Sequence, residues 1–419
     1  MSEKEGLKFI ENPADADIII INTCAFIKTA VEESMKAVLE ATIFKGQTRC
    51  KRIIIAGCLV TRYGKEVFAK IPAVDCFIGP SSIEAIGRII RKYRNGKSSG
   101  REFISGGYKA VDFRERKITG PGHYAYLKLS EGCSNNCSFC TIPMIRGRLR
   151  SRTGRKIIEE AKILAGKGVK ELIIIGQDIA SYGTDKGKQA LPSLLNKIED
   201  IEGINWIRLM YMHPAHITDD IISAISDSKK ICRYADIPLQ HINNGILRAM
   251  NRKITGKEII KLIDTLRNKI GDLKLRTTFI LGFPGETKKI YNELKDFIKT
   301  AEFDRMGAFI YSPEEGTGAY DLSGRVKMSE AAKRHRELMD IQKRISFRRN
   351  KKLTGKRIRV IIDSYNRKNN CYVARSQWDA PDIDCVVNVS GGKLNKGDMP
   401  YVSVKKSSHF ELFAEFKQL

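Results

Sequence analysis

The sequence predicts an α/β protein with three parts. These are an N-terminal α/β domain with a parallel sheet, a central partial (β/α)6 barrel and a small all-β barrel at the C-terminal end. Short β-branched runs alternate with amphipathic helical stretches as far as about residue 320. After about residue 352 the pattern changes to short strands separated by turns. We expect the three domains to span residues 1–115, 119–349 and 352–419.

The N-terminal domain contains two predicted parallel strands that both end in a cysteine. They are ADIIIINTC (16–24) and RIIIAGC (52–58), and the helical pattern of residues 30–42 lies between them. The carboxyl ends of parallel strands lie at one edge of a sheet, so we expect Cys24 and Cys58 to approach each other there. The polar stretch RNGKSSGREFISGG (94–107) predicts a linker.

The central domain has six predicted strands, each followed by a helical pattern. The strands are YAYLKLS (124–130), ELIIIGQD (171–178), WIRLMYM (206–212), YADIPLQ (234–240), LRTTFILGF (275–283) and MGAFIYS (306–312). In β/α barrels functional residues follow the strands, and polar residues do so here, Gln177 after the second strand among them. A basic helix over 329–353 then leads to four predicted strands of the tail, at 357–363, 371–376, 385–390 and 397–404.

Charge and composition narrow the function class. The chain of 419 residues has a formal net charge of +26, which favours an anionic partner such as RNA or a ribonucleoprotein. Basic residues spread over solvated faces explain the same number about equally well. No apolar run approaches the ~18–20 residues of a membrane span, and the first residues do not resemble a signal peptide, so we expect a cytoplasmic protein without a membrane contact.

The segment EGCSNNCSFC (131–140) contains three of the ten cysteines, Cys133, Cys137 and Cys140. In a cytoplasmic chain this usage indicates metal or redox chemistry rather than disulfides. Three thiolates at C-x3-C-x2-C spacing hold three corners of a 4Fe–4S cluster and leave one iron open for a ligand. The alternatives are a zinc site that borrows a distant fourth ligand, or three incidental thiols.

The longer segment EGCSNNCSFCTIPMIRGRLRSR (131–152) resembles the signature of the radical S-adenosylmethionine (SAM) methylthiotransferases. The resemblance extends over essentially the whole chain: it implies a methylthiotransferase N-terminal domain, a radical-SAM partial barrel and a TRAM barrel. It also implies that SAM binds the open iron and is cleaved to a 5′-deoxyadenosyl radical, with Phe139 near the adenine. Gln177 and Arg276 are expected to face the SAM cavity, although a structural hydrogen bond explains each about equally well.

Three further segments are similar to the enzymes of this family that modify a ribosomal-protein aspartate (the RimO type). They are YADIPLQH, YSPEEGTGAYDL and ARSQWDAPDID. The resemblance implies transfer of a methylthio group to the β-carbon of an aspartate in a small-subunit ribosomal protein, with a reductase as electron donor and a contact with RNA. The acidic DAPDID (379–384) suits a basic protein partner, or is only a turn rich in Asp and Pro. The alternative functions are a tRNA adenosine methylthiotransferase and a non-catalytic iron–sulfur protein that binds the ribosome.

The resemblance further implies a second 4Fe–4S cluster in the N-terminal domain, where Cys24 and Cys58 match two of the family's three ligands. The family's first cysteine lies in an opening strand that has no counterpart ahead of Asn22 here. We therefore expect either a start upstream of Met1 or a substitute ligand such as Cys50 or Cys76. Cys50 precedes its strand and Cys76 has the surroundings of a core residue, which favours the first explanation.

Overall fold

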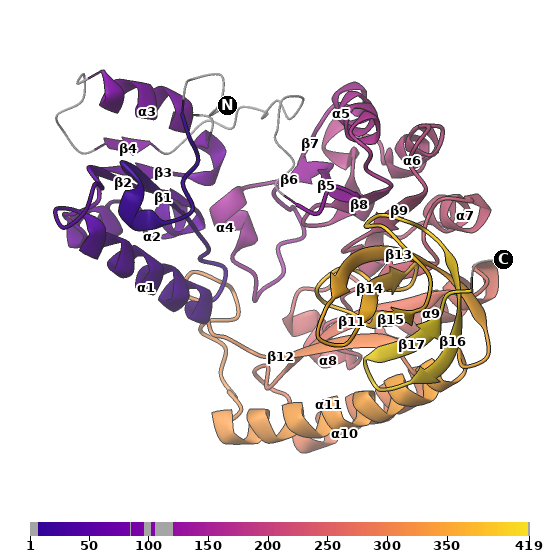
Figure 1. The fold of residues 1–419 in the computed structure, drawn as a ribbon. Coiled ribbons are helices and arrows are strands. Elements are labelled where there is room, and N and C mark those ends of the chain that lie inside the picture. Colours follow the sequence, from indigo (N-terminus) through magenta and orange to yellow (C-terminus); the bar gives the residue numbers. More distant parts are fainter. Residues whose placement is uncertain (1–6, 84, 96–101, 105–119, 418–419) are drawn as a thin grey trace. The chain divides into compact units, whose positions relative to one another are not determined.

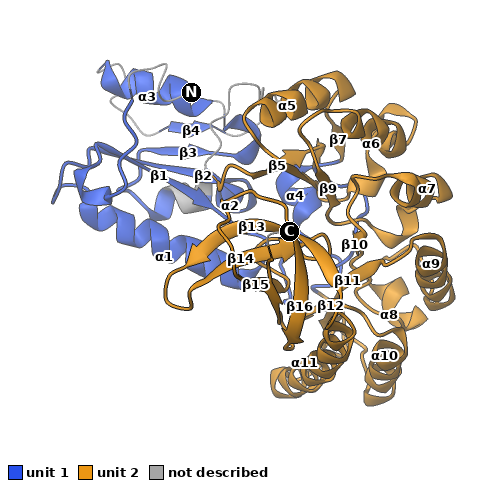
Figure 2. Cartoon of the chain, turned by 45° about the vertical axis from the view of Figure 1, so that its right-hand side comes forward, with its two compact units in different colours: residues 1–116, 132–148, 312–320 blue, residues 117–131, 149–311, 321–419 orange. Residues whose placement is uncertain are grey.

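The computed structural model describes residues 7–83, 85–95, 102–104 and 120–417, and the chain forms two compact units (Figures 1 and 2). Unit 1 comprises Met1–Arg116, Gly132–Arg148 and Ser312–Tyr320. Unit 2 comprises Lys117–Glu131, Leu149–Tyr311 and Asp321–Leu419. The predicted boundary between residues 115 and 119 lies outside the described residues.

Unit 1 contains a parallel sheet with helices on both faces. The strand order is β1 (Ile18–Thr23), β2 (Arg52–Gly57), β3 (Cys76–Ile78) and β4 (Glu102–Ile104). Alternate residues of β2 point to opposite faces, as in any strand. Ile53 and Ile55 pack in the cluster that includes side chains of α1 (Lys28–Phe44) and α2 (Cys58–Lys70), whereas Ile54 packs with α3 (Ala85–Arg94). The two predicted strands and the helix between them are confirmed.

Two features of this sheet differ from the sequence prediction. Residues 102–104, predicted to belong to a linker, form β4 because they pair with β3. The rest of that stretch beyond Asn95 lies outside the described residues. Strand β1, predicted to be buried, is partly exposed, with 43% of Ile20 accessible, because it lies at the edge of the described sheet.

The partial barrel of six strands is confirmed in unit 2. One sheet contains β5 (Tyr124–Lys128), β8 (Glu171–Ile175) and β9 (Trp206–Leu209), and the other contains β10 (Tyr234–Asp236), β11 (Lys274–Leu281) and β12 (Arg305–Ile310). A parallel bridge between Ile207 and Ile231 joins the two sheets. The helices along the barrel are α5 (Gly154–Gly166), α6 (Leu191–Glu199), α7 (Asp219–Asp227), α8 (Asn244–Ala249), α9 (Gly256–Lys269) and α10 (Lys288–Ala301) (Figure 1). Along β11, Leu275, Phe279 and Leu281 pack in the large core of the barrel.

The long helix α11 (Met328–Lys351) leads to a closed five-stranded barrel. Its strands are β13 (Arg357–Asn366), β14 (Cys371–Ser376), β15 (Val386–Ser390), β16 (Tyr401–Ser407) and β17 (Glu411–Glu415). They lie in the order β13-β14-β15-β17-β16. Sequence patterning predicted four of these strands and missed β17, which closes the barrel by pairing with β15 and β16.

Buried ion pairs connect the C-terminal barrel (β13–β17) with the amino ends of the strands β8 and β12 of the partial barrel. Arg305, the first residue of β12, donates to Asp379 Oδ1 from Nη2 over 2.6 Å. Arg375 of β14 pairs with Glu171, the first residue of β8, at 2.8 Å, and both side chains are almost completely buried. Burial disfavours the charged form of Glu171, but Arg208 and Arg375 outweigh it and lower the pKa of Glu171. The carboxyl ends of the strands therefore remain for a functional site.

The acidic segment DAPDID is part of this junction, which corrects its interpretation as a surface for a basic partner. Asp379 is completely buried against Arg305, and Asp384 accepts from the Tyr234 hydroxyl at 2.8 Å. Asp382 is the exposed carboxylate of the segment. The prediction failed because the arginines that neutralise these groups are distant in sequence.

Candidate iron–sulfur and cofactor site

The loop that carries the three cysteines is closed tightly at its base. It leaves through β6 (Ser130–Glu131) and returns through β7 (Arg150–Ser151), and these two segments pair antiparallel. Gly132 has φ +77°, and a Cβ there would lie 2.3 Å from the carbonyl oxygen of Arg148. Only glycine fits this position without strain. Both ends of the loop are therefore held at the carboxyl end of β5.

Cys133, Cys137 and Cys140 are half-buried, so each thiol is supported and still accessible. The Cys133 amide donates to Gly147 O at 3.1 Å, and the Cys140 amide donates to Cys137 O at 3.0 Å. Asn135 Nδ2 lies 3.3 Å from Cys133 Sγ and donates to it. A thiolate donor set of this kind suits iron–sulfur chemistry.

Among the described residues, no group of three or more His, Cys, Asp or Glu side chains surrounds a single metal ion. A 4Fe–4S cluster takes each thiolate on a different iron, so its ligands lie farther apart than those of one ion. Three thiolates are the donor set that such a cluster needs when one iron stays open, whereas a structural zinc site needs a fourth ligand.

The rest of the cysteine loop belongs to unit 1 and packs into its core. Helix α4 (Ile142–Arg146) places Ile145 in the same buried cluster as Cys58 and Leu59. Thr141 Oγ1 donates to Phe26 O at 2.9 Å. Figure 2 gives residues 132–148 the colour of the N-terminal sheet for this reason. The sequence pattern does not indicate that the two cysteine-bearing regions share a unit.

Cys24 and Cys58 follow paired strand ends. Their preceding residues, Thr23 and Gly57, are register partners in β1 and β2, and Thr23 Oγ1 donates to Ala56 O at 2.8 Å. Gly57 has φ +110°, and a Cβ there would lie 2.5 Å from Thr23 O, which allows the two loops to approach closely. Cys24 is exposed and Cys58 is buried. The structure thus brings these two predicted ligands to the same edge of the sheet.

The other candidates for a third ligand lie elsewhere. Cys76 is completely buried in β3, and burial raises the pKa of its thiol to about 12. Cys50 is also buried and precedes β2, at the opposite end of that strand from Cys58. Both positions agree with the reasoning that set these residues aside.

Arg146, the last residue of α4, joins the two cysteine regions directly. Its Nη2 donates to Cys58 Sγ at 3.4 Å. This contact fixes the position of the Cys58 side chain relative to the loop that carries the other three cysteines. Arg146 begins the basic stretch RGRLRSR (146–152), and the structure gives its side chain a contact with a cysteine.

Glu314 organises the same region from the segment that follows the last barrel strand. Its Oε2 pairs with Arg62 at 2.7 Å, and its Oε1 accepts from the Lys28 amide at 2.8 Å. Arg62 also donates to Ala25 O at 2.8 Å, next to Cys24. The side chains of Arg62 and Glu314 are only 7% and 3% exposed. Farther along the segment, the Ala319 amide donates to Ser138 O, inside the cysteine loop.

In unit 2, buried polar atoms without a partner among the described residues follow the barrel strands. They include Ser130 Oγ after β5, Gln177 Oε1 after β8 and Gln240 Oε1, four residues after the end of β10. Buried polar groups normally have hydrogen-bond partners, so these atoms indicate a polar ligand at the carboxyl end of the barrel. Gln177, one of the two residues predicted to face the SAM cavity, lies at this end, and its role in SAM binding stays a prediction.

The structure places Arg276 nearer the amino end of β11. Its Nη1 lies 3.0 Å from Asp236 Oδ1, and its Nε lies 3.5 Å from Asp384 Oδ1 of the C-terminal barrel. Leu275, Phe279 and Leu281 on one face of β11 pack in the hydrophobic core together with the helices. Arg276 alternates with them along the strand, so its side chain points to the other face, toward the barrel interior. Its role in SAM binding stays a prediction, as does that of Phe139, which is half-buried in the cysteine loop.

A buried polar cluster at the same end of the barrel was not predicted as a unit. Asp178 Oδ2 lies 2.6 Å from His216 Nδ1 and accepts from the Ser181 hydroxyl at 2.5 Å. The His213 ring stacks on that of His216, with centroids 4.8 Å apart. Burial and the nearby Arg252 lower the pKa of His213 to about 3. The sequence signal was the position of Asp178 and His213 directly after two strands.

No helix among the described residues has both the length and the apolar character needed to cross a membrane.

Comparison with known proteins supports this organisation. Residues 1–79 match the Uncharacterized protein family UPF0004, residues 127–298 match the Radical SAM superfamily, and residues 354–416 match the TRAM domain. Among solved structures, the radical SAM methyltransferase TsrM from Kitasatospora setae is similar with a TM-score of 0.56 and 12% identity, over 73% of this chain and 64% of that chain. The radical enzyme OxsB is similar with a TM-score of 0.51 and 13% identity, over 78% of this chain and 48% of that chain. At such identities these two structures show the fold alone.

Curated relatives are much more similar. A protein of Thermoanaerobacter sp. (strain X514) named ribosomal protein uS12 methylthiotransferase RimO is 41% identical, over 99% of this chain and 94% of its own length. The protein of the same name from Pelotomaculum thermopropionicum is also 41% identical, over the same two shares. The one from Pelobacter propionicus is 41% identical over 96% of this chain and 90% of its own length. The chain therefore belongs to the RimO family of radical SAM methylthiotransferases.

Proposed function

We propose that this enzyme adds a methylthio group to the β-carbon of an aspartate in ribosomal protein uS12. The observation that carries the proposal is the packing within unit 1. The loop with Cys133, Cys137 and Cys140 and the strand ends with Cys24 and Cys58 share one compact unit, and Arg146 joins them. A reaction that needs both a radical and a sulfur source requires such an arrangement. The names of the curated relatives support uS12 as the substrate.

The residues have distinct roles in this proposal. Cys133, Cys137 and Cys140 would hold a 4Fe–4S cluster, and Gln177 would bind SAM at the barrel mouth. Bound there, the cluster and SAM would supply radical chemistry that can remove hydrogen from an unactivated carbon. The tight base at Gly132 holds the loop, and the buried position of Ala25 and Thr141 helps to keep water from the region between the cysteines.

Cys24 and Cys58 would hold part of a second cluster, at which the sulfur is delivered. Arg146 would hold the Cys58 sulfur in position. Ser34 of α1 holds the Cys24 backbone, because its hydroxyl accepts from the Cys24 amide at 2.9 Å and donates to the Cys24 carbonyl at 2.8 Å. The reaction also needs a reductase as electron donor. A ribosomal substrate implies that the enzyme works in the cytoplasm, and the TRAM match supports a contact with RNA.

The test is an assay of the anaerobically reconstituted and reduced full chain with SAM. Unmodified small ribosomal subunits and bulk tRNA are offered in parallel, and uS12 and digested tRNA are analysed by mass spectrometry. We expect uS12 to gain one methylthio group and tRNA to stay unchanged. Cys137→Ala should abolish SAM cleavage and remove the share of the cluster absorbance that belongs to the cysteine loop. Thiomethylated tRNA beside unmodified uS12 would refute the substrate. Absence of SAM cleavage by the wild-type chain would favour a non-catalytic protein.

A further inference from the structure

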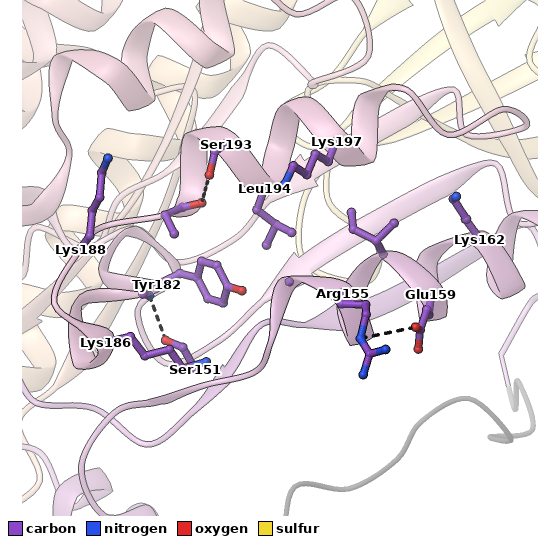
Figure 3. Close-up of a pocket in the computed structure, with 14 residues that line it drawn as sticks. Ser151, Arg155, Glu159, Lys162, Tyr182, Lys186, Lys188, Ser193, Leu194 and Lys197 are labelled. Carbon is purple, nitrogen blue, oxygen red and sulfur yellow. Dashed lines mark hydrogen bonds and ion pairs between the residues drawn. The ribbon is translucent and has the colours of Figure 1, made fainter.

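A groove lies on the outside of the barrel in unit 2, between α5 and α6 (Figure 3). Its volume is about 560 Å³, within the usual range for ligand sites of ~300–1,000 Å³. Ile158, Tyr182 and Leu194 contribute apolar surface to it. In Figure 3 the Tyr182 ring and the Leu194 side chain point into the hollow. The Tyr182 hydroxyl donates to Arg152 O at 2.8 Å, which fixes the ring.

The residues that line the groove have a strong excess of positive charge. Five of them are basic and one is acidic. The basic residues are Arg155, Lys162, Lys186, Lys188 and Lys197, all of them exposed. The acidic residue, Glu159, lies 3.9 Å from Arg155 and is partly neutralised by it. Asp185, next to Lys186 in the sequence, accepts from the Ser151 amide at 2.9 Å. The groove therefore attracts an anion that also has flat or apolar parts.

The groove begins beside the base of the cysteine loop. Ser151 lies in β7, whose partner β6 leads directly into that loop, and Ser151 Oγ accepts from the Gly183 amide at 2.9 Å. The segment from Tyr182 to Lys188 follows the carboxyl end of β8. A ligand in the groove thus lies beside the carboxyl end of β8, the end of Gln177 and of the proposed SAM site.

We infer that this α5–α6 groove binds the RNA of the small ribosomal subunit while uS12 is in the active site. The inference rests on the proposed function. RNA offers phosphates to the lysine rim and bases or riboses to the apolar floor, a combination typical of single-stranded nucleic-acid sites. An acidic peptide would satisfy the charge, but its backbone offers no ring to the apolar surface of the groove. A basic ribosomal protein would be repelled.

The test compares two triple variants that change the net charge equally. The groove variant is Lys162→Glu, Lys188→Glu, Lys197→Glu. The control is Lys257→Glu, Lys288→Glu, Lys289→Glu, at exposed positions of α9 and α10. A third variant, with arginine at the three groove positions, keeps the charge. Binding of each to unmodified small subunits and to labelled polyuridylate is measured between 50 and 200 mM salt, and Trp fluorescence in urea checks folding.

We expect the groove variant to lose three phosphate contacts. Each phosphate contact contributes about 0.7–0.9 to the slope of log affinity against log salt concentration. Raising the salt from 50 to 200 mM should therefore weaken the binding of the wild type by a factor roughly 20–40 times larger than that for the groove variant. At 50 mM salt its affinity should be at least about tenfold lower than that of the control. Methylthiolation of assembled subunits should fall accordingly, whereas methylthiolation of isolated uS12 should not change. The arginine variant should match the wild type.

Equal subunit affinity and equal salt slope for the groove variant and the control would overturn the inference. So would competition by polyglutamate at concentrations where polyuridylate does not compete. If the wild type modifies no uS12, the proposed function fails, but the binding comparison still decides whether the groove takes RNA. The two failures are therefore distinguishable.

Discussion

Replacing Glu314 with glutamine should destabilise unit 1 strongly. The change keeps the side-chain shape and removes the charge that neutralises Arg62, whose guanidinium is buried at 2.7 Å from it. Breaking a buried ion pair in this way costs about 3–5 kcal/mol. The glutamine oxygen can still accept one hydrogen bond, so we expect about 3 kcal/mol, the lower end of that range. The matched control is Glu40→Gln, because Glu40 lies 3.9 Å from Lys36 in an exposed pair on α1 that contributes about 0.5 kcal/mol or less.

The assay must report on unit 1 alone. Both tryptophans, Trp206 and Trp378, belong to unit 2, so their fluorescence does not follow this change. Hydrogen exchange of the peptides that cover β1 and β2 does follow this change. A loss of about 3 kcal/mol in the free energy of unfolding corresponds to roughly 150-fold faster exchange of the amides that open with the whole unit. Protection within twofold of that of Glu40→Gln would refute the reasoning. The double change Arg62→Met, Glu314→Leu should recover most of the stability, because apolar side chains of similar volume often replace a buried pair at little cost.

Two further changes test the loop and the barrel. Gly132→Ala should lose iron at the cysteine loop, because a Cβ there would lie 2.3 Å from Arg148 O and the residue has φ +77°. The control Gly166→Ala has open space around its Cβ and should keep the iron content of the wild type. Equal iron content in the two variants would contradict this prediction. Folding lowers the pKa of His213 from 6.5 to about 3. Between pH 6.5 and pH 3 the unfolded chain therefore binds one proton more than the folded chain, so the free energy of unfolding of unit 2 must fall as the pH falls through that range. At about 1.4 kcal/mol per pH unit, urea unfolding followed by Trp fluorescence should show unit 2 about 2 kcal/mol less stable at pH 5 than at pH 7, and His213→Gln should remove that difference.

Local sequence patterns predicted the strands that are buried on both faces. A run such as Glu171–Ile175 can be little else than a parallel strand in an α/β protein, and it forms β8 with four of its five residues buried. The same reasoning placed Gln177 and the cysteine loop after their strands, because strand direction alone determines that end. It failed for β4, since three residues between polar segments form a strand only through their partner β3.

Long-range charge pairing could not be predicted. Arg62 and Glu314 are 252 residues apart in sequence, and Arg305 and Asp379 are 74 apart. Each of these residues has the same local signal as a solvated surface charge. Only the tertiary fold makes Glu314 a buried hub and turns Asp379 from an apparent partner-binding carboxylate into a counter-ion at the barrel junction.

The cysteine loop follows the first barrel strand, and the Glu314 segment follows the last one, yet both belong to the unit of Cys24 and Cys58. The geometry of the two cysteine sets therefore depends on the core of unit 1, where Ile145 packs beside Cys58, rather than on the packing of the barrel. A change in that core should disturb iron binding at both sets together. A change at the junction of the two barrels, such as one at Arg305, should destabilise unit 2 and leave the relation between the cysteine sets intact. Sulfur transfer needs a constant separation between the radical source and the sulfur, and a shared core provides it by packing alone.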